Sequence, residues 1–130
     1  MSIWSHVAGI VRIDDIRFLG ETNWTEYFGK EVRFSSPKDV WEDYDEHPED
    51  YLPVGSEGSL YSSLWVNPDE HSMAAYTLMI FGDLRDYVSP EKIIEWFKEK
   101  LSGIPVVRQA VITVETEGLE SVVYNYEEEK

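Results

Sequence analysis

The sequence predicts an α+β fold of the ferredoxin-like sandwich type, with the order β-α-β-β-α-β, a C-terminal hairpin strand, and helices on one face of an antiparallel sheet. Three observations lead to this prediction. The 130 residues fit one domain, 1–130, and the 42% hydrophobic content is enough for a packed core. Five segments are rich in β-formers, most with the two-residue alternation of strands, and two capped segments have the period of helices. Residues 127–130 are expected to be a solvated acidic tail.

The predicted strands differ in how they are buried. Segment 5–17 carries apolar side chains on both sides of its alternation, which favours a central place in the sheet. Segment 73–83 is also apolar on both faces and is expected to be interior, paired as a hairpin with 59–66. Glu117-Gly118 predicts a tight turn before the last strand. In chain order the five strands are 5–17, 59–66, 73–83, 106–116 and 119–126.

Residues 89–103 carry the strongest helix signal. Ser89 can cap the N-terminus, Pro90 fits the first helical position, and Gly103 suits the end. The apolar residues recur at helical spacing and predict a buried stripe of Ile93, Ile94, Phe97 and Leu101. Residues 23–29 carry weaker capping signals and are expected to form a short helix or helical turn.

A further helix is expected between Ser36 and Pro48. Ser36 can cap it, Pro37 fits its first position, and Pro48 limits its far end. This helix would be unusually acidic, because residues 39–51 hold seven carboxylates and no lysine or arginine. One face would carry Asp39, Glu42, Asp43 and Glu46, and the other Val40, Trp41 and Tyr44.

The charge of the whole chain restricts its partners. Twenty-six acids against eleven bases leave a net charge of −15, and no base occurs between Asp39 and Leu84. Binding to nucleic acid or to an anionic membrane needs lysine and arginine, so neither is expected as a direct partner. A cationic protein surface is the expected partner.

Composition also indicates a location. The chain has no cysteine, which excludes disulfides and thiolate metal sites. Its first residues lack the basic and small-residue pattern of a signal peptide, and no apolar run approaches the length of a membrane span. A cytoplasmic location is therefore expected, in the host cell if a phage encodes the protein.

Metal binding and catalysis are not expected. The triplet Asp-Glu-His occurs at 45–47 and at 69–71, each time beside a proline. Histidine and carboxylates can ligate metals, but adjacent residues rarely converge on one ion, so neither a metal nor a cofactor is predicted. No G-x-S-x-G, P-loop or G-x-G-x-x-G motif is present, and His6 is expected to be a packed or edge histidine. The sequence thus favours a protein that is not an enzyme.

The favoured function is an acidic interaction protein that binds a basic, nucleic-acid-binding protein. Carboxylates one helical turn apart lie about 6 Å from each other, near the spacing of successive phosphates. In composition the chain resembles the small acidic nucleic-acid mimics with which phages inhibit host DNA-binding defence proteins. The charges of the predicted contact surface are Asp39, Glu42, Asp43, Asp45, Glu46, Glu49 and Asp50, and its apolar anchors are Trp41, Tyr44 and Tyr51.

A small-molecule-binding module is the alternative function. Tyr61 and Trp65 share one face of the strand 59–66, where they would form an aromatic platform for a neutral or cationic ligand. Such a module would use a sheet face or the cleft of a homodimer. A well-formed apolar pocket would favour this alternative, whereas salt-dependent binding to a basic protein would favour the acidic interaction protein.

Overall fold

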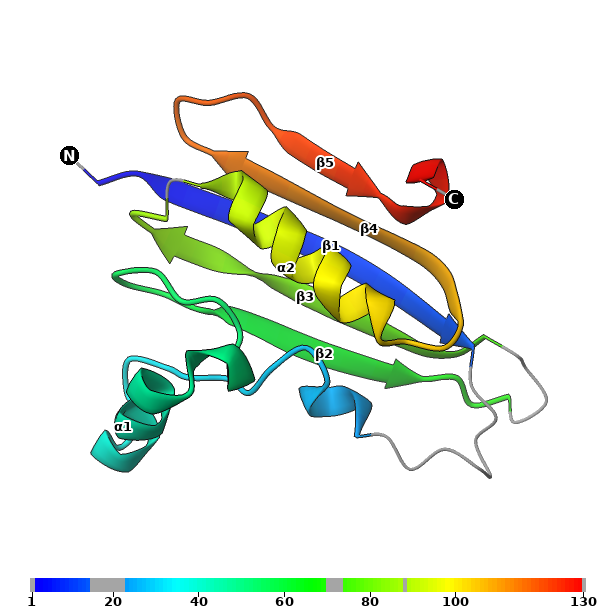
Figure 1. The fold of residues 1–130 in the computed structure, drawn as a ribbon, viewed down its shortest axis with the longest axis horizontal. Helices are drawn as coiled ribbons and strands as arrows, with labels where there is room; N and C mark the ends of the chain where they lie inside the picture. The colour runs from blue at the N-terminus through cyan, green and yellow to red at the C-terminus, as the bar shows by residue number, and fades with distance from the viewer. Residues whose placement is uncertain (1, 15–22, 70–73, 88, 130) are drawn as a thin grey trace.

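The computed structural model of the protein describes residues 2–14, 23–69, 74–87 and 89–129 (Figure 1). A five-stranded sheet runs through the molecule in the order β2-β3-β1-β4-β5, and every neighbouring pair is antiparallel. The α+β class and the antiparallel sheet are therefore as the sequence predicts. The elements are β1 (Trp4–Asp14), η1 (Trp24–Glu26), α1 (Lys38–Glu46), η2 (Pro48–Asp50), β2 (Leu60–Val66), β3 (Ala74–Arg85), α2 (Pro90–Ser102), β4 (Val107–Thr116), β5 (Val122–Asn125) and η3 (Tyr126–Glu129).

The long strand β1 is the centre of the sheet, as its two-sided apolar pattern predicts. It pairs with β3 on one side and β4 on the other, so that Gly9 lies between Ile80 and Ile112. The strand β5 is shorter than predicted, because only residues 122–125 pair with β4. The first strand is described to Asp14, and the predicted residues 15–17 lie outside the described part of the chain.

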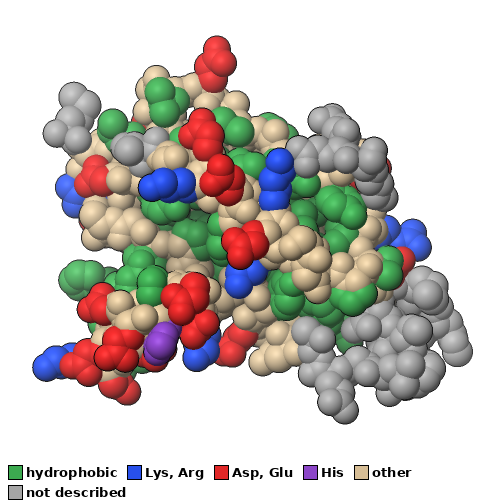
Figure 2. Space-filling model, viewed as in Figure 1, with side chains coloured by type: hydrophobic (Ala, Val, Ile, Leu, Met, Phe, Trp, Pro, Cys, Tyr) green, Lys and Arg blue, Asp and Glu red, His purple; other side chains and the backbone are tan. Residues whose placement is uncertain are grey.

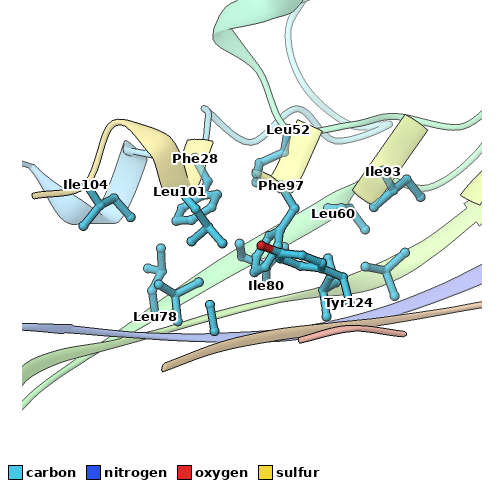
Figure 3. Close-up of a cluster of buried hydrophobic side chains, with 14 of the residues drawn as sticks. Phe28, Leu52, Leu60, Leu78, Ile80, Ile93, Phe97, Leu101, Ile104 and Tyr124 are labelled. Carbon is cyan, nitrogen blue, oxygen red and sulfur yellow. The ribbon is translucent and has the colours of Figure 1, made fainter. Parts of the chain in front are cut away.

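The helix α2 packs across one face of the sheet and forms the core there (Figure 3). Ile93, Phe97 and Leu101 follow the i, i+4, i+8 spacing of one helix face, and all three are buried as predicted. Figure 3 shows Phe97 and Leu101 pointing from α2 toward the sheet, where Leu78 and Ile80 rise to meet them. Burial of side chains of this size contributes about 1.5–3 kcal/mol each.

The helix α1 does not cover the sheet, and this corrects the prediction of helices on one face. None of its residues is buried, and in Figure 1 it stands beyond the β2 edge of the sheet. The space beside α2 is filled by Trp24, Phe28 and Leu52, which belong to η1 and to irregular segments, and Phe28 stacks on Phe97 with ring centroids 5.8 Å apart. These aromatic and aliphatic side chains offer more apolar surface than the acidic helix does, so they take the buried position.

No described helix packs on the second face of the sheet, which is named the open face. Segment 73–83 is interior in strand order, as predicted, but one of its two apolar faces is exposed. Met79 and Phe81 of β3 are 46% and 41% exposed, and Trp65 of β2 is 53% exposed. Because strand side chains alternate, the apolar residues on this side of β3 face solvent while Leu78 and Ile80 enter the core.

The described chain ends in a short 3-10 helix, η3. After β5 the chain turns into η3, which contacts β4, so residues 126–129 form a 3-10 turn where the sequence indicates a solvated tail from 127. Within the described ranges no helix is both long enough and apolar enough to cross a bilayer.

Candidate protein-interaction surface

Residues 39–51, named the acidic segment, consist of most of α1, His47, the turn η2 and Tyr51. Pro37 occupies the N-cap position of α1 with extended backbone, and no side chain caps the helix. The predicted cap, Ser36, instead accepts a hydrogen bond from the Arg33 amide at 2.9 Å, which closes a turn before the helix. The helix ends at Glu46, where the His47 amide donates to the Asp43 carbonyl, and Pro48 begins η2.

The carboxylates of the acidic segment face solvent. Figure 2 shows acidic side chains gathered at the lower left of the molecule, over α1. The described cations near them are few: Lys38 Nζ lies 3.7 Å from Glu42, and Lys30 lies over the Tyr51 ring. Like charges at i,i+4 lower the stability of a helix by about 0.2–0.5 kcal/mol per pair, so the carboxylates on this face of α1 repel one another. The exposed members are Asp39, Glu42, Asp45, Glu46, Glu49 and Asp50, and Asp43 is half-buried.

Asp43 is the one carboxylate of the segment with a structural role. Its Oδ2 accepts a hydrogen bond from the Tyr51 hydroxyl at 2.7 Å, which fastens α1 to the chain that follows η2. This bond, together with burial of the ring, raises the pKa of Tyr51 to about 12, because the bonded carboxylate disfavours a phenolate. Asp43 therefore fixes the position of the helix more than it extends the charged surface.

The three predicted aromatic anchors form one cluster in the structure. The Trp41 and Tyr44 rings meet edge to face at 5.8 Å, and the Tyr44 and Tyr51 rings do the same at 5.6 Å. Tyr51 is only 6% exposed, so it packs against the inner side of α1 and is not accessible to a partner. Trp41 and Tyr44 are half-buried and keep part of their surface available.

Of the two Asp-Glu-His triplets, the structure describes the first in full and only Asp69 of the second. In the first, His47 joins Glu49 and Asp50, which bring one ligand atom each to within 4.8 Å of the others. All three side chains are exposed, and exposed acidic groups of this kind are common without an ion, so this cluster alone does not define a site. In the second, Asp69 is an exposed turn residue, and 70–71 lie outside the described residues.

His6 pairs with a carboxylate but not with a nucleophile. Its Nδ1 lies 2.7 Å from Asp83 Oδ1, and this hydrogen bond raises the pKa of His6 above its ordinary value. The pair is exposed on the open face. The hydrogen bonds described for the His6 ring go to Asp83 alone, so the pair has the base and orienting group of a triad without a hydroxyl to activate.

A feature that sequence reasoning missed is the extent of the open face. The alternation of segment 59–66 correctly places Tyr61 and Trp65 on one side, and Tyr61 contacts Phe81 across the strand pair. Phe34, in the turn before α1, is 94% exposed, and it lines a hollow with Tyr61 and Phe81 at one border of this face. The sequence does contain a signal for this face: segment 73–83 is apolar on both sides, and a strand of that kind needs a cover on each side.

No protein-family model, curated protein or solved structure matches the chain. The interpretation of its surfaces therefore depends on their own geometry and charge.

Proposed function

We propose that this protein is a non-catalytic interaction protein that binds a basic surface of a second protein through its acidic segment. The observation that carries the proposal is the position of α1, which buries none of its residues and presents six exposed carboxylates together with η2. A helix that adds so little to the core, and whose charges repel one another, is stabilised when a cationic surface covers it. Trp41 and Tyr44 supply apolar contacts within that charged surface.

The partner that fits this surface best is a nucleic-acid-binding protein. Carboxylates on successive turns of α1 repeat at about 6 Å, close to the repeat of phosphates along a strand, so the segment can occupy a groove built for phosphates. A net charge of −15 adds long-range attraction that accelerates association. Inhibition of such a protein in the cytoplasm, as phage-encoded nucleic-acid mimics do, is the activity we propose.

We also propose that the fold belongs to the ferredoxin-like class with an added edge strand. The strand order β2-β3-β1-β4 supports this assignment, since β1 lies between two strands that are both antiparallel to it. The departure from that class is at the position of the first helix: η1 and irregular chain lie beside α2 where a packed helix would be expected. The same replacement is what leaves α1 outside the core.

The alternative, a small-molecule module, has weaker support. The hollow described at the centre of the open face has a volume of about 170 Å³ and is lined by Ala8, Ile10, Met79, Phe81 and Val111, with backbone between them. Pockets for drug-sized ligands usually have about 300–1,000 Å³ and a few convergent polar groups. This hollow is smaller, and its lining side chains are apolar. The hollow at the border of the open face is larger, about 510 Å³, and Tyr61 lines it with Phe34 and Phe81, but Trp65, the other residue of the predicted aromatic platform, does not.

The test compares two variants that remove the same charge from different helices. The α1 triple variant is Glu42→Gln, Asp45→Asn and Glu46→Gln; it leaves Asp43 intact because that residue bonds Tyr51. The matched control changes Glu91, Glu95 and Glu99 of α2 to Gln, which are exposed and share one helix face. Proteins captured by the immobilised wild-type chain are identified, and the affinity of the best binder is measured for all three forms at several salt concentrations.

We expect the α1 triple variant to bind at least tenfold more weakly, about 1.4 kcal/mol, and to show a flatter salt dependence. The α2 variant should bind within about twofold of the wild type, because its net charge is the same but its acidic segment is intact. Equal losses in both variants would mean that net charge alone attracts the partner. Unchanged binding by the α1 variant would refute the proposal.

A further inference from the structure

The open face of the sheet has the composition of an interface. Its centre is apolar, with Ala8 and Ile10 on β1 flanked by Met79 and Phe81 on β3. No described helix packs against it, and its apolar side chains Met79, Phe81, Trp65 and Val123 are 41–60% exposed. Soluble monomers rarely leave a continuous apolar surface of this extent uncovered.

The open face carries charges of both signs, whereas the acidic segment carries carboxylates and no lysine or arginine. Arg12 and Arg85 lie on this side of the sheet with Asp14, Asp83 and Glu115, according to the alternation of their strands. Arg85 is paired with Glu57 and Asp14 with Arg108. This mixture of both signs suits association with a copy of the same chain, which otherwise carries −15 and repels itself. A polycation would instead be drawn to the acidic segment, and a nucleic acid or anionic lipid would be repelled.

The arrangement of these charges along β1 is self-complementary. Arg12 lies at one end of the face and has no ion-pair partner among the described residues. At the other end, about 20 Å away by the rise of six strand residues, His6 lies between Asp83 and Glu115 on the neighbouring strands. A two-fold axis in the interface and perpendicular to β1 would place Arg12 of each copy over His6 of the other, between those two carboxylates.

The same axis matches side chains by size. Gly9 lies at the midpoint between His6 and Arg12, so Ile10 of one copy meets Ala8 of the other. On β3, Met79 is opposite Ile10 and Phe81 opposite Ala8, so Met79 of one copy meets Phe81 of the other. Sulfur–aromatic and large-to-small contacts pack well. A two-fold axis parallel to β1 would instead superpose Arg12 on Arg12 and Asp83 on Glu115, which like-charge repulsion disfavours.

The area of the face is sufficient for a stable dimer. Strands of 11, 7, 12, 10 and 4 residues form it. With a rise of about 3.3 Å per residue and a strand spacing of about 4.8 Å, they span roughly 700 Å². Standard interfaces bury about 800 Å² on each partner, and Phe34 at the border enlarges the apolar surface beyond the strands.

We propose that the protein forms a two-fold homodimer through the open face, with antiparallel β1 strands stacked face to face and Arg12 of each copy between Asp83 and Glu115 of the other. The acidic segments lie beyond the β2 edge, outside this interface, so the dimer presents two of them to its partner. The dimer is independent of the function proposed above.

Sedimentation velocity of the full chain between about 1 and 100 µM tests this proposal. We expect a species of twice the 15.1 kDa chain mass. Met79→Lys should weaken the dimer at least thirtyfold although it lowers the net negative charge. Its control is Val66→Lys, at a residue 49% exposed on the α2 side of β2, which should leave the dimer unchanged. Circular dichroism checks that both variants keep the wild-type fold.

Charge reversal tests the orientation of the two copies. Arg12→Glu and Glu115→Arg should each weaken the dimer at least tenfold, because each places like charges together twice across the axis. The double variant should recover most of the affinity, since the exchanged charges again meet across the interface. A monomer of the wild-type chain at 100 µM would overturn the proposal and assign the face to another partner. A dimer that survives Met79→Lys, or a double variant no better than the single ones, would overturn it equally.

Discussion

The helices α1 and α2 begin with the same kind of sequence signal but have opposite roles in the fold. Each has a proline at or before its first turn, after a serine, and each has an apolar side by its spacing. Yet α2 buries Pro90, Ile93, Phe97 and Leu101, whereas α1 buries none of its residues. One helix fixes the fold, and the other carries charge outside it.

The length of the apolar stripe explains the difference. In α2 the buried residues recur over three turns of a 13-residue helix, which is enough to cross the sheet. In the nine residues of α1, Val40, Trp41 and Tyr44 fall within little more than one turn, and Trp41 and Tyr44 make edge-to-face contacts in the cluster with Tyr51 instead of contacts with the sheet. An amphipathic pattern thus predicts a helix, but it does not predict that the helix packs against the sheet.

The largest contrast is expected from truncating one aromatic residue in each helix. Phe97→Ala should lower the free energy of unfolding by about 3–5 kcal/mol, because it opens a cavity among fully buried side chains. Trp41→Ala should cost less than about 1.5 kcal/mol, since Trp41 is half-buried outside the core. Urea denaturation of both variants measures these values. Equal losses would show that α1 is part of the core.

A smaller effect is expected where α1 is attached. Tyr51→Phe removes the hydrogen bond to Asp43 and should lower the free energy of unfolding by about 0.5–1.5 kcal/mol. The raised pKa of Tyr51 gives a pH signature. Stability from this group is complete below pH 10, the ordinary tyrosine pKa, and falls as the pH rises toward about 12.

Ultraviolet titration of the phenol and unfolding curves between pH 9 and 12 measure this signature. Tyr51→Phe is the control for both measurements, because it should remove the phenol of raised pKa and, with it, the extra pH dependence of stability. Burial also raises the pKa of Tyr27 and Tyr87, so the comparison is with the variant: if the wild type and Tyr51→Phe have the same number of phenols that titrate well above pH 10, the bond to Asp43 does not fasten the helix.

The smallest effect is expected from neutralising surface carboxylates. The α1 triple variant should be as stable as the wild type or up to about 1 kcal/mol more stable, because it relieves repulsion within α1 and near its C-terminus. The α2 triple variant should be as stable or slightly less so, since Lys92, Lys98 and Lys100 offset the acids there and Glu91 favours the helix N-terminus. Thermal unfolding of both ranks them. A marked loss in the α1 variant would mean that its charges are structural.

Much of the fold follows from the sequence, and the exceptions have identifiable causes. Alternation and turn signals are local, so they place β1 at the centre, α2 on the sheet and the turn at Glu117-Gly118. Competition for the core is not local. Nothing within residues 36–48 shows that Phe28 and Leu52 occupy the space beside α2, because those residues lie in segments with weak patterns of their own.

The acidic segment and the open face also differ in how far the sequence predicts them. The acidic segment is continuous in sequence and could be predicted residue by residue, except that Tyr51 and Asp43 face each other and serve the support of α1. The open face is assembled from strands that are far apart in the chain, so its apolar centre appears only when the sheet is formed. In the sequence, the alternation of 59–66 predicts the platform of Tyr61 and Trp65, and the two apolar faces of 73–83 are the other local sign of this surface.

Native-state hydrogen exchange tests most directly whether α1 is independent of the core. Backbone amides of α2 around Phe97 should exchange only through global unfolding, so their opening free energy should equal the stability measured in urea and fall with denaturant at the same slope. Amides of α1, including the one that His47 donates to Asp43, should open at several kcal/mol less and with almost no denaturant dependence. Amides in both helices that open together at the global free energy would contradict the division of roles.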